Sequence, residues 1–304
     1  MTDPSLIRKA ADILHKGGLV AFPTETVYGL GADASNESAV KSIFRVKGRP
    51  DSHPLIVHLW DVDQVVLWAD VIPEAARELG RRFWPGPLTM ILMKAGRVSK
   101  VVTGGQETVG LRVPDHPVAL ALLREFGGGV AAPSANRFGK VSPTSADHVR
   151  QDLGGDVDFI LDGGPCTIGV ESTIVDFTSG DPVILRPGGL TRERLEEALG
   201  RPVPVRAPGE VRVSGQLESH YAPRALVTIV APGDASKAAE DLRRTGKQVV
   251  LLGEKDVAAQ ELYASLRRAD DSGADVIVVP LPDETGLGLA VADRLRKAAG
   301  KRYL

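Results

Sequence analysis

Apolar residues recur along the chain in two spacings that alternate. Spacings of three and four residues predict helices at 4–16, 36–47, 73–83, 116–126 and 145–152, with another that opens at Thr191. Short apolar runs bounded by glycine and proline predict strands at 19–22, 55–59, 88–93, 108–114, 130–132, 158–165, 171–177 and 182–189. Such alternation of strands and helices is typical of an α/β sheet protein.

The pattern is interrupted once and then resumes. Residues 201–225 are rich in proline and glycine and have little apolar periodicity, so they are predicted to form a linker. Beyond them, strands LVTIVA, QVVLLG and DVIVVP alternate with helices at about 235–245, 256–269 and 285–299, which predicts a small parallel α/β domain with a modest core. The predicted division is a first domain at 1–203, a linker at 204–225 and a second domain at 226–304.

Composition narrows the class of protein. Of the 304 residues, 43% are hydrophobic and 25% charged, which is ordinary for a globular chain. Lysine and arginine total 37 against 39 acidic residues, so there is no global field to attract nucleic acid, and any polyanion site must be local. Cys166 is the single cysteine and cannot form an internal disulfide. No export signal or membrane-length apolar run is visible, so a cytoplasmic location is expected.

The stretch AFPTETVYGLGADA, residues 21–34, is a candidate pocket. An apolar run delivers the backbone to a Pro-Thr-Glu-Thr turn, and Gly29 and Gly31 then let the chain fold back closely. Small hydroxyls and main-chain amides would face one another there.

Two cations, Lys47 and Arg49, leave the end of the predicted second helix together. They could simply complement the negative end of the helix dipole. However, Pro50 and Pro54 fix the exit path of the loop, and the next strand is of the buried type, so the cations are expected beside the candidate pocket. Anion binding is the interpretation that we favour.

Further polar residues lie on predicted strands or at their ends. Arg112 shares a strand face with Thr108, where its guanidinium could fork onto a carboxylate or phosphate. Ser134 and Asn136 follow the strand at 130–132, at a place where open α/β sheets commonly contact ligands. With Arg186 at the end of another strand, these residues indicate a site for phosphate and carboxylate groups.

Other motifs give weaker evidence of function. There is no Walker-type phosphate loop, and Gly286 and Gly288 lack the third glycine of a dinucleotide fingerprint. The histidines have no metal-ligand spacing, so no metal site made of protein ligands alone is predicted.

These blocks together resemble the YrdC-type threonylcarbamoyl-AMP synthases over about residues 5–200. In order, they are PTETVYGLGADA, KGRP with PLIVH, PGPLT, TVGLRVP, PSAN with SPT, ESTIVD and ILRPG. HYAPR at 220–224 resembles the linker of the long, two-domain form, and GADVIVVPLPDETGLGLAVADRLRKAA resembles its C-terminal domain. The resemblance implies a YrdC-like twisted mixed sheet with helices around a deep cavity, plus a smaller C-terminal Rossmann-like parallel α/β domain.

The resemblance also implies an enzyme, a nucleotidyltransferase of the L-threonylcarbamoyladenylate synthase type. Such an enzyme makes threonylcarbamoyl-AMP and pyrophosphate from L-threonine, bicarbonate and ATP. The product serves threonylcarbamoyladenosine modification of tRNA, at the adenosine next to the anticodon, by a separate tRNA threonylcarbamoyl transferase, so direct tRNA binding is not required. Mg²⁺ is expected to accompany ATP, held mainly by phosphates and water.

Family roles carry over to matching positions. The catalytic pair that faces the phosphates would be Lys47 and Arg49. The L-threonine site would comprise Thr26, His58, Arg112, Ala132 and Ser172, with Arg112 as the partner of the carboxylate. The ATP site would comprise Arg49, His53, Thr108, Ser134, Asn136, Ser142, Arg186 and Tyr221.

These assignments have three consequences for how the site would work. His53 departs from the asparagine that is commoner in the family, so its contact could depend on pH. Tyr221 belongs to the linker and would fold back on the nucleotide, which makes the linker a candidate lid. No residue stands out as a general base, so positioning and electrostatics are expected to supply most of the catalysis.

The alternative is a non-catalytic RNA-binding module. The local cluster of Lys47, Arg49, Arg112 and Arg186 could favour it. Near-neutral charge and the lack of an RNA-binding motif or a run of exposed aromatics count against it.

Overall fold

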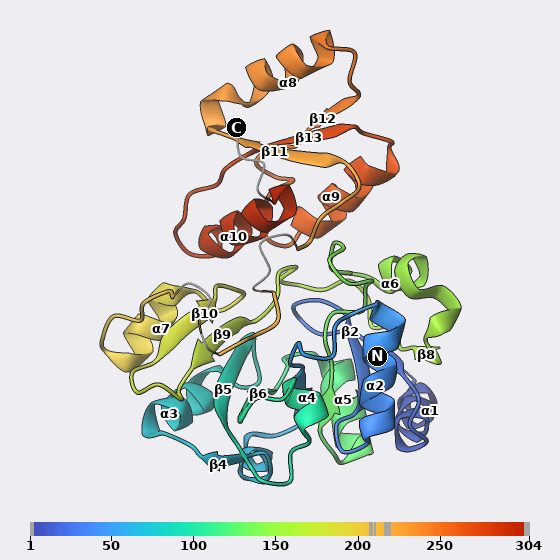
Figure 1. The fold of residues 1–304 in the computed structure, drawn as a ribbon, viewed down its shortest axis with the longest axis vertical. Coiled ribbons are helices and arrows are strands. Elements are labelled where there is room, and N and C mark those ends of the chain that lie inside the picture. Colours follow the sequence, from blue (N-terminus) through green and yellow to red (C-terminus); the bar gives the residue numbers. More distant parts are fainter. Residues whose placement is uncertain (1–2, 207–208, 210, 216–219, 301–304) are drawn as a thin grey trace.

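The computed structural model describes residues 3–206, 209, 211–215 and 220–300. These residues form a larger body built on a mixed sheet and a smaller body built on a parallel sheet, with the two stacked along the long axis (Figure 1). The predicted α/β architecture is confirmed.

The larger sheet has ten strands among the described residues. They are β1 (Val20–Phe22), β2 (Gly29–Asp33), β3 (Ile56–His58), β4 (Ala69–Val71), β5 (Leu88–Lys94), β6 (Thr108–Arg112), β7 (Val130–Ala131), β8 (Phe159–Ile160), β9 (Thr173–Asp176) and β10 (Val183–Arg186). Their order is β10-β9-β5-β6-β3-β7-β2-β1-β8, with β4 paired to β5. The sheet is mixed because β3 and β6 are parallel, whereas β5 and β6 are antiparallel.

Helices surround this sheet. They are α1 (Pro4–His15), α2 (Glu37–Lys47), α3 (Glu74–Phe83), α4 (Lys100–Thr103), α5 (Pro117–Phe126), α6 (Ala146–Leu153) and α7 (Arg192–Leu199), with 3₁₀ turns at Val62–Leu67 and Gly154–Asp156. The Asn36 side chain caps α2, and Gly48 ends it with φ 64°, a left-handed conformation that glycine adopts without strain. This end directs Arg49 toward the sheet.

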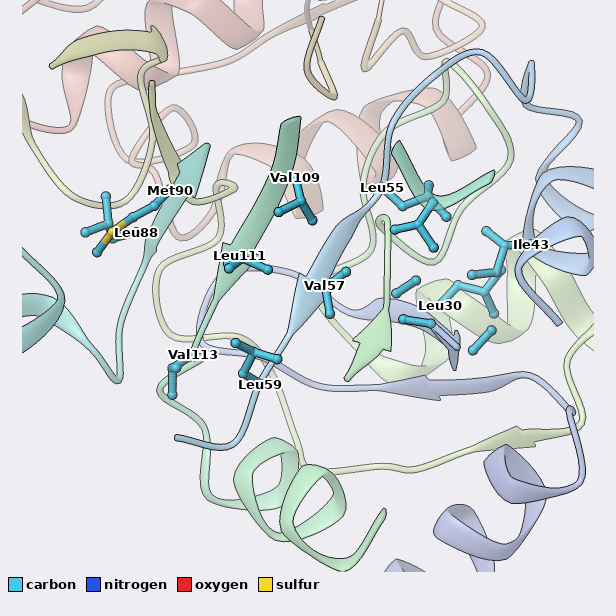
Figure 2. Close-up of a cluster of buried hydrophobic side chains, with 14 of the residues drawn as sticks. Leu30, Ile43, Leu55, Val57, Leu59, Leu88, Met90, Val109, Leu111 and Val113 are labelled. Atoms are coloured by element: carbon cyan, nitrogen blue, oxygen red, sulfur yellow. The ribbon is translucent and has the colours of Figure 1, made fainter. Parts of the chain in front are cut away.

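The main core lies between the sheet and its helices. Figure 2 shows Leu30 of β2, Val57 of β3 and Leu111 of β6 in one cluster with Ile43 of α2. Each of these side chains is fully buried. Because burial of one such side chain contributes roughly 1.5–3 kcal/mol, the cluster holds α2, and the cations at its end, firmly against the sheet.

The smaller body contains β11 (Leu226–Val230), β12 (Val249–Leu251) and β13 (Val276–Pro280), in the order β11-β13-β12. Both neighbours run parallel to β13, as predicted. Its helices are α8 (Ala235–Arg244), α9 (Leu262–Asp271) and α10 (Gly288–Ala299), with a 3₁₀ turn at Pro232–Asp234. Helices α9 and α10 lie between the small sheet and the larger body (Figure 1).

Some local predictions are wrong. The Gly-Leu-Gly segment lets the chain fold back closely, as predicted, but it lies in strand β2, antiparallel to β1, and not in a turn. The close approach requires glycine, because a Cβ at Gly31 would come within 2.8 Å of Phe22 and Val130. Strand β6 is buried on both faces and not half-buried, since it lies inside the sheet between β3 and β5. Helix α9 begins at Leu262, later than expected, and β8 covers only two residues of 158–165.

Part of the predicted linker lies outside the described residues, at 207–208, 210 and 216–219. The described remainder is attached at several points. Val205 forms a bridge with Ile184 of β10, and the Ala222 amide donates a hydrogen bond to the Gly139 carbonyl over 2.9 Å. In the part of the chain that the structure describes, no helix is both long and apolar enough to cross a membrane.

Candidate active site

A cavity of about 50 Å³ lies beside strands β3, β6 and β10 and is closed by residues from the predicted linker. Eight of the predicted site residues line it: Arg49, His58, Arg112, Ala132, Ser134, Ser172, Arg186 and Tyr221. Residues that were not predicted also line it, among them Thr24, Glu171, Ser214, Gly215 and His220. The fold therefore brings most of the predicted residues to one place.

Arg49 and Arg186 present positive charge to this cavity. Both are buried, with exposed fractions of 7% and 3%. Arg49 donates from Nη2 to the Pro54 carbonyl (3.0 Å) and Ser214 Oγ (3.1 Å), while its Nε has no hydrogen-bond partner among the described residues. Arg186 donates to the Ser172 carbonyl (2.8 Å) and, from Nη1, to the Ser214 carbonyl (3.1 Å).

Lys47 lies behind this wall instead of lining the cavity. It is 3% exposed and donates from Nζ to the Ser134 and Asn136 carbonyls, each over 2.5 Å. Burial, and then the positive charge of Arg49, lower its pKa well below the usual value. Lys47 therefore holds the loop that carries Ser134 and Asn136.

None of Lys47, Arg49 and Arg186 forms an ion pair with a carboxylate of the described residues. Burial lowers the pKa of Arg49 to about 10, so it is charged at neutral pH. Buried cations are normally paired, because removing an unpaired charge from water is costly. A cluster of buried cations that form no ion pair within the described residues is a feature expected of an anion-binding site.

Arg112 provides a second kind of contact. Its Nη2 lies 2.7 Å from Glu25 Oε1 and 2.9 Å from Thr26 Oγ1, and all three residues are buried. Its Nε has no hydrogen-bond partner among the described residues. The guanidinium thus forms a buried ion pair with one carboxylate beside a threonine hydroxyl, and a planar guanidinium of this kind can bind carboxylates.

Glu25 was not among the predicted site residues. Glu25 is the only carboxylate in the Pro-Thr-Glu-Thr segment, and this was the one sequence feature that could have indicated a role. Its partner Arg112 is far away along the chain, so no local pattern links the two residues.

His58 and Ala132 complete this end of the cavity. Burial, and then Arg112, lower the pKa of His58 to about 3, so its imidazole is neutral at physiological pH. The Ala132 amide donates a hydrogen bond to the Ile56 carbonyl over 2.9 Å, so the carbonyl is the polar main-chain group of Ala132 that remains for a ligand.

Glu171 and Ser172 form the opposite wall. Ser142 does not line the cavity directly but donates from Oγ to Glu171 Oε1 over 2.6 Å. Ser172 Oγ lies 2.8 Å from Thr89 Oγ1. A Cβ at Gly188 would come within 2.3 Å of the Glu171 carbonyl oxygen, so glycine is required there for the Arg-Pro-Gly segment to support this wall.

Thr26, His53, Thr108, Asn136 and Ser142, like Lys47, lie outside the lining of the cavity. Thr26 and Ser142 are hydrogen-bonded to the lining residues Arg112 and Glu171, respectively. Asn136 donates from Nδ2 to the Arg137 and Lys140 carbonyls, both over 2.8 Å, and so holds its own loop. His53 packs edge-on against Phe138, and burial, followed by Arg49, lowers its pKa. Their ligand contacts stay predictions.

Tyr221 is the single non-glycine residue with positive φ among those described, at 61°. This conformation costs on the order of 1–3 kcal/mol for a residue with a Cβ, and it commonly marks a functional site. The side chain is buried, and a Cβ at Gly215 would come within 2.4 Å of its hydroxyl oxygen. The backbone is therefore arranged to place this ring over the cavity.

The fold and the site together define a class: an α/β protein whose cavity combines buried cations, unpaired among the described residues, with an arginine in a buried ion pair. The chain belongs to the Sua5/YciO/YrdC family, whose model, described as "Telomere recombination", matches residues 12–188. A second model, described as the C-terminal domain of threonylcarbamoyl-AMP synthase, matches residues 190–300.

Individual relatives agree with this membership. The chain is 45% identical to the threonylcarbamoyl-AMP synthase of Pyrococcus abyssi, over 98% of this chain and 95% of that protein. It is 43% identical to the threonylcarbamoyl-AMP synthase of Bacillus subtilis, over 100% and 95%. The crystal structure of P. abyssi Sua5 complexed with L-threonine matches with a TM-score of 0.94 and 43% identity, over 99% of this chain and 96% of that chain.

Proposed function

We propose that the protein is an L-threonylcarbamoyladenylate synthase, a nucleotidyltransferase that converts L-threonine, bicarbonate and ATP to threonylcarbamoyl-AMP and pyrophosphate. The observation that carries this proposal is the cavity in which buried cations, unpaired with any carboxylate of the described residues, lie beside Arg112 and its ion pair with Glu25. The synthase name of the full-length relatives supports it. In this proposal, residues 1–203 are the catalytic domain, 204–225 the linker and 226–304 the second domain.

The chemistry needs few proton transfers from the protein. The threonine amine combines with bicarbonate to give a carbamate and water, and a carbamate oxygen then attacks the α-phosphorus of ATP. An oxygen–phosphorus bond forms there, and the bond to the bridging oxygen breaks as pyrophosphate leaves. The protein must orient the two reactants, offset the charge on the phosphates and exclude water from the labile carbamate.

The two ends of the cavity divide these tasks. Arg112, whose Nε has no hydrogen-bond partner among the described residues, would hold the threonine carboxylate, with Thr26 beside it. Arg49 and Arg186 would offset the phosphate charge, with Lys47 behind them. The buried, neutral His58 lines the threonine end without adding charge.

Mg²⁺ is proposed to accompany ATP. The described residues contain no group of three or more histidine, cysteine, aspartate or glutamate side chains that could hold a metal ion. The donor set therefore fits an ion held mainly by phosphate oxygens and water, and we assign no protein ligand to it. The product would pass to a tRNA threonylcarbamoyl transferase, and we propose a cytoplasmic location.

One assay tests the function and the alternative together. Purified protein with ATP should release pyrophosphate only when both L-threonine and bicarbonate are present. No release combined with tight RNA binding would favour the RNA-binding module instead, whereas release that needs neither substrate would contradict the proposed reaction. The catalytic proposal is the better supported, because full-length relatives are named as synthases.

Arg112→Lys should weaken L-threonine binding about tenfold or more while changing ATP binding little. Lysine keeps the charge but loses the planar fork that can bind a carboxylate through two hydrogen bonds. Calorimetric titration of each substrate measures this, with Arg124→Lys on the exposed face of α5 as the control. A larger loss for ATP than for threonine would move Arg112 to the nucleotide end.

Ser214, Gly215 and Tyr221 should move when nucleotide binds. A cavity of about 50 Å³ is far below the roughly 300–1,000 Å³ of pockets for ligands of this size, and these three residues close it. We expect the hydrogen exchange of residues 211–215 and 220–224 to change when ATP and threonine are added, and Tyr221→Phe to reduce product formation. Unchanged protection with bound ATP would show that these residues are only a connector.

A further inference from the structure

The C-terminal helices reach the wall of the cavity through one carboxylate. Arg294 of α10 donates from Nε to Glu171 Oε2 over 2.7 Å, and the Tyr263 hydroxyl of α9 donates to the same oxygen over 2.8 Å. The other oxygen of Glu171 accepts the hydrogen bond from Ser142. Glu171 thus joins two residues of the smaller body to a predicted nucleotide contact, and it lines the cavity itself.

The same two residues support Tyr221. The Arg294 guanidinium carbon lies 5.1 Å from the centre of the Tyr221 ring, and the Tyr221 and Tyr263 rings are stacked with centres 5.7 Å apart. Arg294 and Tyr263 are both fully buried. The ring that closes the cavity therefore lies on a surface made by α9 and α10.

The ionised state of Glu171 depends on the cations around it. Burial alone would raise the pKa of Glu171, but Arg294 and then Arg186 hold it at about 2, so the carboxylate is ionised. Arg186, the other cation that favours the ionised Glu171, lines the cavity. Within the described residues, Arg294 forms the ion pair with Glu171, while Arg186 donates to Ser172 and Ser214.

We propose that Arg294 and Tyr263 are positioning residues for the nucleotide end of the active site. They hold Glu171, and through it Ser142 and the surface under Tyr221, so that residues of the smaller body complete the site. This inference rests on the proposed function, because it assigns the nucleotide end of the same cavity. A purely structural anchor would use the same contacts without affecting ATP.

The test compares Tyr263→Phe and Arg294→Lys in the full chain with wild type. Arg244→Ala is the matched control, because Arg244 lies on the same body but pairs with Asp241 on the exposed side of α8. The measurements are kcat, KM for ATP and for L-threonine, ATP binding by calorimetry, and the melting temperature. We expect KM and Kd for ATP to rise about fivefold in Tyr263→Phe and at least tenfold in Arg294→Lys, with threonine binding changed less than twofold.

A second signature is non-additivity. Tyr263→Phe and Ser142→Ala act through the same carboxylate, so the double variant should lose less ATP affinity than the sum of the two single losses. Independent, additive losses would argue against a shared action through Glu171.

The outcomes separate clearly. A lower melting temperature with unchanged ATP parameters would show a structural anchor and overturn the inference, as would equal losses for both substrates. If wild type binds ATP but makes no product, the proposed function fails, while ATP binding by the variants still decides the positioning role. If Arg294→Lys does not fold, Tyr263→Phe, which removes one hydroxyl, carries the test alone.

Discussion

Arg49→Ala should lower pyrophosphate release at least about 30-fold, which corresponds to about 2 kcal/mol of transition-state stabilisation. Arg49 is buried at the cavity, and its Nε lacks a hydrogen-bond partner among the described residues. In the proposed reaction, the phosphates supply that partner as negative charge shifts toward the leaving pyrophosphate. The loss should therefore appear in kcat as well as in KM for ATP.

The same substitution should leave the stability of the empty protein unchanged or raise it. Arg49 has no carboxylate partner among the described residues, so removing its charge relieves a desolvation cost instead of breaking an ion pair. Thermal unfolding without ligand measures this effect. Arg45→Ala is the control, because Arg45 is on the exposed face of the same helix and contacts only Ser42 among the described side chains. Near-normal turnover by folded Arg49→Ala would remove Arg49 from the catalytic pair.

Much of the fold could be predicted because its elements carry their own local signals. Helix α2 has an apolar stripe, a capping asparagine and a terminal glycine within a few residues, and its predicted bounds are confirmed. Strand β2 was missed because its glycines weaken the strand signal. Its glycines serve the close approach of Phe22 and Val130, which only the folded sheet brings together.

The site shows the same division between local and distant information. Arg49 and Arg112 could be proposed because each lies within a recognisable segment. The role of Glu171 could not, since its partner Arg294 is 123 positions away and no local pattern links them. Glu25 was missed for the same reason, because its function depends on a pairing across the sheet.

Lowering the pH should have the largest effect on the free energy of unfolding. Stability should fall steeply between pH 6.5 and pH 5, because several histidines are buried in their neutral form. Burial lowers the pKa of both His58 and His220 to about 3, and that of His148 to about 4. In the unfolded chain these groups have pKa values of about 6.5, so the unfolded state binds protons that the native state cannot.

The sign and size of this effect follow directly. The stabilisation is fully present above pH 6.5 and is lost as the pH falls from there toward 4 and 3, and each deeply buried histidine should remove on the order of 2 kcal/mol by pH 5. Two of them together approach the lower end of the total stability of about 5–15 kcal/mol that is usual for a folded protein. The carboxylate of Glu171, with its pKa held at about 2, adds a further loss only below about pH 4.5.

Urea unfolding at pH 8, 6.5, 5.5 and 5 measures the slope, and His220→Gln isolates one contribution. His220 is buried and lines the cavity, so its replacement also alters packing. That packing change is measured at pH 8, where His220 is neutral in both the native and the unfolded state. The difference in free energy of unfolding between wild type and His220→Gln should then shrink by up to about 1.4 kcal/mol for each pH unit below 6.5. The reason is that the variant lacks the imidazole that takes up a proton when wild type unfolds. Equal slopes in the two proteins would mean that His220 takes up its proton in the native state, and the closed cavity would then open in acid without unfolding.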